Sequence, residues 1–108
     1  MAKPRVDELD FDSAEEFLAE RPQCRHLRVR RRADLLTIES GSPRDPVPHA
    51  RLRQVTVHLW RLEMPTHSER WETTPFRDQL RTLLEMLVSD FGWALAPIDD
   101  GAWHERHR

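Results

Sequence analysis

Histidines and acidic residues in the middle of the chain are the side chains that could perform catalysis. A small hydrolase needs a histidine as general base and a carboxylate within hydrogen-bond reach. His58 and His67 are the candidate bases, and Glu63, Glu69 and Glu72 are the candidate acids. His58 lies in an apolar run, where burial shifts the pKa of an imidazole, and a hydrogen-bonded structural role is the alternative. A histidine-dependent hydrolase is therefore one of three hypotheses for the function.

The motifs of nucleophilic and cofactor-dependent enzymes are missing from the sequence. A serine nucleophile of the hydrolase type occupies a tight elbow, whereas Ser40-Gly41-Ser42 has only the composition of a turn. The three glycines, Gly41, Gly92 and Gly101, are too far apart to form a phosphate-binding loop. We expect no cofactor, identify no small-molecule substrate, and predict a non-catalytic protein.

Metal binding, disulfides and membrane insertion are not indicated either. Cys24 is the only cysteine, so neither an intramolecular disulfide nor a thiolate cluster can form. His104 and His107 have a chelating spacing, but no second ligand pair has the spacing of a structural zinc site. Residues 1–8 lack the apolar core of a signal peptide, and no run approaches the roughly 18 apolar residues of a membrane span. We predict no metal site and a cytoplasmic location.

Charge is unevenly distributed along the chain. The formal net charge is −2, yet residues 21–61 contain ten arginines and three acidic residues, between acidic segments at 1–20 and 62–100. The alternative function, nucleic-acid binding, rests on the densest part of this Arg-rich segment. The other interpretation is that these arginines pair with acids from the first helix or a partner subunit. The residues concerned are Arg28, Arg30, Arg31 and Arg32.

Apolar periodicity places the Arg-rich segment in a strand pair that follows a short helix. Ser13 and Glu16 have the spacing of a capping box, and Pro22 ends the run, so we predict a helix at about 13–20. From residue 25 the period is two, which turns Leu27 and Val29 inward and Arg28 and Arg30 outward. A short turn then leads to a second strand at 35–39. Three prolines and a glycine predict an extended loop at 41–48.

A third strand is predicted at 53–64, with apolar residues on both faces. Only one of these faces can pack against the helix of the same domain, so the other requires a cover. We therefore predict a protein-interaction surface that contains His58, Trp60 and Leu62, formed with a second copy of the chain or another protein. Trp71 joins this surface because it lies in a polar stretch that includes a short fourth strand at 70–72.

Thr74 and Pro75 have the pattern of a helix start, and apolar spacings of three and four predict a long amphipathic helix at about 75–91. Gly92 is expected to end this helix in a left-handed conformation, with Trp93 packing back onto it. The fold class is α+β: a short N-terminal helix, a three- or four-stranded antiparallel β-meander, and the long C-terminal helix on one sheet face. Residues 1–10 and 99–108 are predicted to be flexible, on either side of a single domain at 11–98.

The predicted element order is shared with double-stranded-RNA-binding domains. That class uses a Lys-rich start to its last helix and a Gly-Pro loop between its first strands. Here the corresponding segments are Pro75-Phe76-Arg77-Asp78 and Arg32-Ala33-Asp34, so both features are missing. The leading hypothesis is therefore a small non-catalytic interaction protein, a homodimer or the binder of a protein partner, without a membrane partner.

Overall fold

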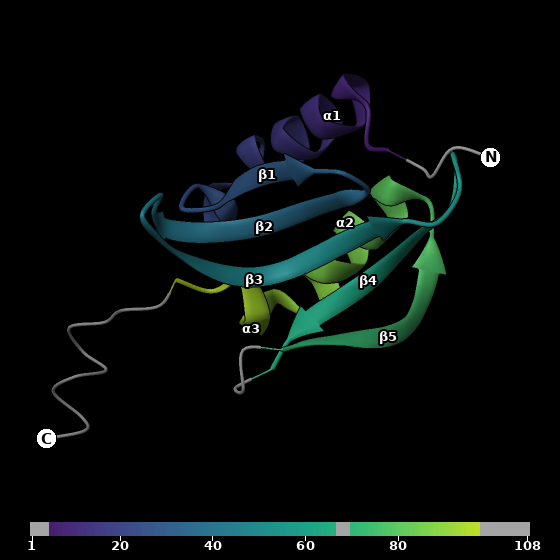
Figure 1. The fold of residues 1–108 in the computed structure, drawn as a ribbon. Coiled ribbons are helices and arrows are strands. Elements are labelled where there is room, and N and C mark those ends of the chain that lie inside the picture. Colours follow the sequence, from purple (N-terminus) through teal and green to yellow (C-terminus); the bar gives the residue numbers. More distant parts are fainter. Residues whose placement is uncertain (1–4, 67–69, 98–108) are drawn as a thin grey trace, which may run out of the picture.

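Five strands form one antiparallel sheet with helices on one side (Figure 1). The computed structural model describes residues 5–66 and 70–97. The elements are α1 (Glu8–Ala19), the 3₁₀ helix η1 (Pro22–Cys24), β1 (Arg28–Arg32), β2 (Leu35–Ser42), β3 (Asp45–Gln54), β4 (Trp60–Pro65), β5 (Trp71–Asp78), α2 (Leu80–Asp90) and α3 (Gly92–Leu95). The strands lie side by side in sequence order, so each strand is followed along the chain by its neighbour in the sheet. The α+β class and the antiparallel sheet are confirmed, with five strands in place of three or four.

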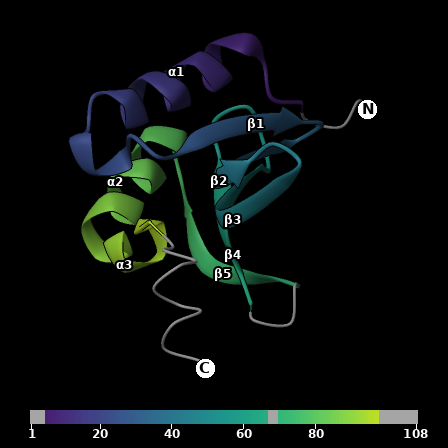
Figure 2. The same ribbon diagram turned by 90° about the vertical axis from the view of Figure 1, so that its left-hand side faces the viewer.

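One face of the sheet packs against the helices and forms the core (Figure 2). α2 contacts β4 and β5, α3 contacts β3, and α1 contacts β1 and α2. Apolar burial drives this packing, since β1 to β4 and both long helices contribute side chains to one cluster. The large buried side chains of the cluster include Phe17, Leu18, Leu36, Ile38, Leu52, Trp60, Leu62, Leu83, Leu84 and Leu87. No described segment covers the opposite face of the sheet.

α1 begins earlier than the sequence pattern predicts. Its N-cap is Asp7, whose carboxylate accepts a hydrogen bond from the amide of Asp10 at 2.8 Å. Asp7 accepts a hydrogen bond from a free amide of the first turn, and the acidic residues of that turn interact favourably with the positive end of the helix dipole. The helix therefore begins before Ser13. Val6, within the segment predicted to be flexible, is buried and donates its amide to Ala33 O.

The predicted loop at 41–48 is wrong, because β2 and β3 form a hairpin that runs through it. Ser42 pairs with Asp45, and a bulge follows Ile38. Prolines two residues apart direct their nitrogens to the same edge of a strand. β4 pairs only with residues 51–54 of β3, so the edge of β3 opposite β2 is unpaired at residues 45–50. The nitrogens of Pro46 and Pro48 can face that unpaired edge, where a missing N–H costs no hydrogen bond.

The predicted continuous strand at 53–64 is also wrong, because the chain reverses at residues 55–59. The amide of Val55 donates to Leu59 O at 2.8 Å, and the Thr56 hydroxyl accepts from the amide of Leu59 at 3.1 Å. Thr56 thus closes the turn with its side chain, without the glycine or proline that usually marks a reversal. Val57 is 74% exposed at this position. The two-faced strand on which the homodimer prediction rested is therefore not part of the fold.

The predicted helix at 75–91 is confirmed only over its second part. Residues 75–78 belong to β5, and α2 starts at Leu80 after Gln79, which makes no side-chain cap. The Thr74 hydroxyl donates to Leu62 O at 2.8 Å instead of capping a helix. Pro75 fits this edge strand because it lies where the β4–β5 register shifts, so its missing amide breaks no ladder bond. Leu80, Leu83, Leu84 and Leu87 form the buried stripe of α2.

After α2 the chain continues into the short helix α3. Gly92 lies in α3 and does not have the positive φ expected of a left-handed cap. Trp93 points away from the core and is 74% exposed, contrary to the prediction that it packs back onto the helix. Leu95 supplies the buried contact instead.

Part of the sequence prediction concerns residues outside the described ranges. His67, Glu69, His104, His107 and the tail at 99–108 are among them. Within residues 5–66 and 70–97, no helix combines the length and apolar character needed to cross a bilayer.

Candidate functional site

The face of the sheet turned away from the helices carries most of the strand arginines. Cross-strand partners project to the same side of a sheet, so the register places them in rows. One row runs Arg30, Thr37, Arg51, Glu63, Thr73, and the next runs Arg32, Leu35, Arg53, Arg61, Arg77. Arg28 lies on this side opposite Glu39. We call this surface the arginine face, made of Arg28, Arg30, Arg32, Arg51, Arg53, Arg61 and Arg77.

Glu63 lies at the centre of the arginine face and holds three guanidinium groups. Arg51 Nη2 is 2.6 Å from Glu63 Oε1, while Arg53 Nε and Arg61 Nη2 are each 3.1 Å from Oε2. Arg53 also reaches the carboxylate of Asp34 at 3.0 Å. The Glu63 side chain is only 3% exposed, because the arginine side chains lie over it. The Glu63 carboxylate therefore lies beneath the three arginine side chains and holds their guanidinium groups together.

Ionised arginines keep Glu63 charged in spite of its burial. Burial alone raises the pKa of a carboxyl group, because it disfavours the charged form. Hydrogen bonds from Arg53 and Arg51 outweigh that effect and lower the pKa of Glu63 below its ordinary value. Glu63 is accordingly an anion at neutral pH, and its oxygens accept hydrogen bonds from the three arginines.

A second carboxylate, Glu39 of β2, holds the arginines of β1. Arg28 Nη2 lies 2.9 Å from Glu39 Oε2, and Arg30 Nε lies 3.1 Å from Oε1. Arg28 and Arg30 thus project from the sheet as the alternation predicts, and they pair with the neighbouring strand rather than with α1. Arg31 lies on the other side of β1, with its guanidinium 5.6 Å from the centre of the Phe11 ring.

Trp71 contributes an aromatic surface to the arginine face. The Arg51 guanidinium lies 4.3 Å from the centre of the Trp71 ring, a cation–π distance. Trp71 is half-buried, so one part of the indole supports Arg51 while another remains open to solvent. The interface role predicted for Trp71 stays a prediction.

The other residues predicted to form a protein interface lie elsewhere. Trp60 and Leu62 belong to the core, where they are 2% and 0% exposed. His58 is exposed in the turn between β3 and β4, and its charge acts on Asp10 of α1. Glu63, the acid proposed for a hydrolase, bonds to arginines and to no histidine in the described part of the chain.

The structure brings together a polar cluster that sequence reasoning missed. Ser40 Oγ lies 2.7 Å from His49 Nε2, and His49 Nδ1 lies 2.8 Å from Ala94 O. Ser40 and His49 come together only because β2 and β3 form the hairpin that the prolines conceal in the sequence. A serine–histidine pair is the arrangement of a nucleophile and its base. Both residues are buried beneath α3, however, and this conformation leaves a substrate no access to them.

We compared the chain with known proteins. Searches of protein-family models, curated proteins and solved structures found no match. In residues 5–66 and 70–97, no group of three or more His, Cys, Asp or Glu side chains is placed to hold a metal ion. The arginine face is thus the feature whose chemistry bears most directly on function.

Proposed function

We propose that this chain is a non-catalytic interaction protein that binds an acidic partner protein on its arginine face. The observation that carries the proposal is that the acids of this face are enclosed, while its arginines still have N–H groups to donate. Glu63 and Glu39 are both buried, and Arg30 remains 56% exposed. Arg61 Nε also lacks a hydrogen-bond partner among the described residues, but it is buried and is not a donor that a partner could reach. The accessible guanidinium groups, with Arg30 the clearest case, suit a partner that supplies carboxylates, which match the guanidinium geometry.

The arginines are also positioned in advance of binding. Glu63 fixes Arg51, Arg53 and Arg61, and Trp71 supports the Arg51 guanidinium. A side chain that is already ordered loses less conformational entropy when a partner arrives. Arginine and tryptophan are also the residue types that concentrate binding energy in protein interfaces.

A protein partner fits this face better than nucleic acid or a second copy does. Sheets that bind single-stranded nucleic acid stack successive bases on several aromatic rings. In the described strands, Trp71 is the aromatic residue whose ring joins the arginine face. The acidic residues of α1 lie on the helix side of the sheet, so a second copy docking there would make a head-to-tail contact and not the two-fold contact of most homodimers.

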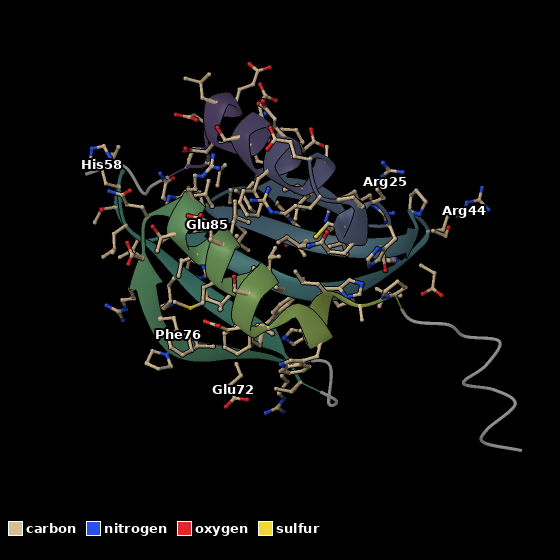
Figure 3. All side chains as sticks on the ribbon, turned by 180° about the vertical axis from the view of Figure 1, so that it is seen from behind. Arg25, Arg44, His58, Glu72, Phe76 and Glu85 are labelled. Atoms are coloured by element: carbon tan, nitrogen blue, oxygen red, sulfur yellow. The ribbon has the colours of Figure 1, made fainter. Side chains whose placement is uncertain are left out.

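Fluorescence anisotropy with defined probes tests the proposal. The probes are a short fluorescein-labelled Glu-rich peptide and a labelled oligothymidine of matched length. We expect the peptide to bind at low ionic strength and to lose affinity as salt rises toward about physiological strength. The double variant Arg30→Ala/Arg61→Ala should lose this binding. Arg25→Ala, which removes an exposed arginine on the helix side (Figure 3), should keep it.

Three results would overturn the proposal. Tighter binding of the oligothymidine, lost in the same double variant, would indicate nucleic acid as the ligand. Equal loss of peptide binding in the Arg25→Ala control would show that overall charge, and not the arginine face, attracts the peptide. Sedimentation equilibrium showing a dimer that Arg30→Ala/Arg61→Ala dissociates would assign the face to self-association.

A further inference from the structure

Two histidines from different parts of the chain hold consecutive carbonyl groups at the end of α3. His26, just before β1, places Nε2 at 2.6 Å from Leu95 O, and His49 of β3 places Nδ1 at 2.8 Å from Ala94 O. A carbonyl oxygen only accepts hydrogen bonds, so both of these nitrogens carry a proton. The two rings meet edge to face with their centres 5.9 Å apart. Together they satisfy acceptors that the end of a helix otherwise leaves free.

The neutral form of His49 has a partner for each ring nitrogen. Its Nδ1 donates to Ala94 O, and its Nε2 accepts from the Ser40 hydroxyl at 2.7 Å. The residue is only 3% exposed. A second proton would create a buried cation, whose surroundings are the neutral Ser40 of β2, the α3 carbonyls and the second imidazole of His26. Among the described residues, His26 is the titratable group whose charge acts on His49, and no acid there offsets the burial; only the bond to Ala94 O favours the protonated ring.

We infer that His26 and His49 form an acid-sensitive clamp that holds α3 against the sheet and releases residues 91–97 when the buried His49 becomes protonated. Burial lowers the pKa of His49, in line with a site that favours the neutral ring. Local release hydrates the cation with less disruption than global unfolding, because α3 has four residues and Leu95 is its buried one.

Release of α3 has a consequence for the exposed aromatic side chains. Phe91 lies 5.7 Å from the Phe76 ring of β5 and 6.3 Å from the Trp93 ring of α3. Phe76 and Trp93 are both exposed, so this cluster forms an aromatic surface between β5 and α3. Movement of α3 would separate its members, and the clamp would thereby make this surface depend on pH.

Hydrogen exchange of the full chain, followed by mass spectrometry and corrected for intrinsic exchange rates, tests the clamp. Between about pH 7.5 and about pH 5, where histidine titrates, we expect protection of residues 91–97 to fall about tenfold or more. Protection of α2 should remain nearly constant over the same range. Loss of protection in α2 and α3 together, or constant protection of both, would overturn the inference.

Substitutions that keep a donor but cannot titrate separate the clamp from general acid sensitivity. The amide of Gln can replace Nε2 in His26→Gln, and the amide of Asn can replace Nδ1 in His49→Asn. His49→Asn should flatten the pH response of residues 91–97, whereas His26→Gln, which keeps the donor to Leu95 O, and His58→Gln, in the exposed turn, should retain it. If His49→Asn does not fold, His49→Gln takes its place. An unchanged pH response in a folded His49 variant would contradict the clamp.

Discussion

Arg51 and Glu63 are direct cross-strand partners whose ion pair is enclosed on a face of the sheet that no described segment covers. They lie opposite each other in the β3–β4 register, and Arg51 Nη2 is 2.6 Å from Glu63 Oε1. Their side chains are 16% and 3% exposed. An enclosed pair differs from a surface salt bridge, because removing one member leaves the other desolvated and uncompensated.

Glu63→Gln should therefore destabilise the protein strongly while changing side-chain volume very little. Three guanidinium groups would lose their common anion, and Gln would present an amide N–H to arginines that also donate. Because the arginines keep some solvent contact, we expect a loss of about 2–3 kcal/mol, at or below the lower end for a broken buried pair. Urea unfolding measures it. The control is Glu72→Gln, at an exposed position in β5, and a similar small effect in both variants would contradict the prediction.

The same carboxylate should give the protein an acid-sensitive limb of stability. Arginine hydrogen bonds lower the pKa of Glu63 from its usual 4.5, so the folded state releases this proton more readily than the unfolded state does. The resulting stabilisation is complete above pH 4.5 and is lost as the pH falls through the lower folded value. Urea midpoints measured below pH 4.5 should fall with pH in the wild type and much less in Glu63→Gln. Parallel pH curves would contradict this assignment.

The alternation of apolar and polar residues predicts which arginines project from the outer face of the sheet, but it does not predict what they contact. Leu27 and Val29 are apolar, so the period of two turns Arg28 and Arg30 to the other side, as the structure has it. Their partner Glu39 depends on the register of the β1–β2 hairpin. Such a register follows from the position of the turn, and a shift of one residue would reverse every facing side chain.

Longer-range features escaped sequence reasoning for related reasons. An alternating apolar run fits one long strand and also two strands with a turn between them, because the turn at Thr56 is closed by a hydroxyl. Thr74-Pro75 fits a helix start and equally an edge strand with a register shift. The Ser40–His49 contact requires the β2–β3 hairpin and its bulge, and neither is visible in a segment with three prolines.

Substitution of Val57 distinguishes the turn from the continuous strand that the sequence suggested. In the turn its side chain is 74% exposed, so Val57→Asp should change the free energy of unfolding by less than about 0.5 kcal/mol. Leu52→Ala in the core is the reference, with an expected loss of about 2–5 kcal/mol. Chemical denaturation of both variants provides the comparison. A large loss in Val57→Asp would mean that residues 55–59 are packed as a strand.

Gly41 should be required by the backbone near the β2–β3 turn. Its φ is +79°, and an added Cβ would lie 3.2 Å from Asp45 O. Gly41→Ala would combine backbone strain with a close contact to a backbone atom, so we expect a loss of about 1–2 kcal/mol. Gly92→Ala is the matched control, since nothing lies within 4 Å of its added Cβ and the residue is helical. Thermal unfolding should show a lower midpoint for the first variant and an unchanged or slightly higher one for the second.

The contact of Arg51 with Trp71 should stabilise the arginine face through the aromatic ring and not only through the size of the side chain. The guanidinium lies 4.3 Å from the ring centre, where a partly buried cation–π contact is worth about 0.5–1 kcal/mol. A double-mutant cycle of Trp71→Leu and Arg51→Met isolates that coupling, because each substitution leaves an apolar side chain but removes the ring or the charge. The double variant should lose less free energy of unfolding than the sum of the losses in the two single variants. Trp71→Phe, which retains an aromatic face, should recover part of the coupling, whereas full additivity would show that Arg51 depends on Glu63 alone.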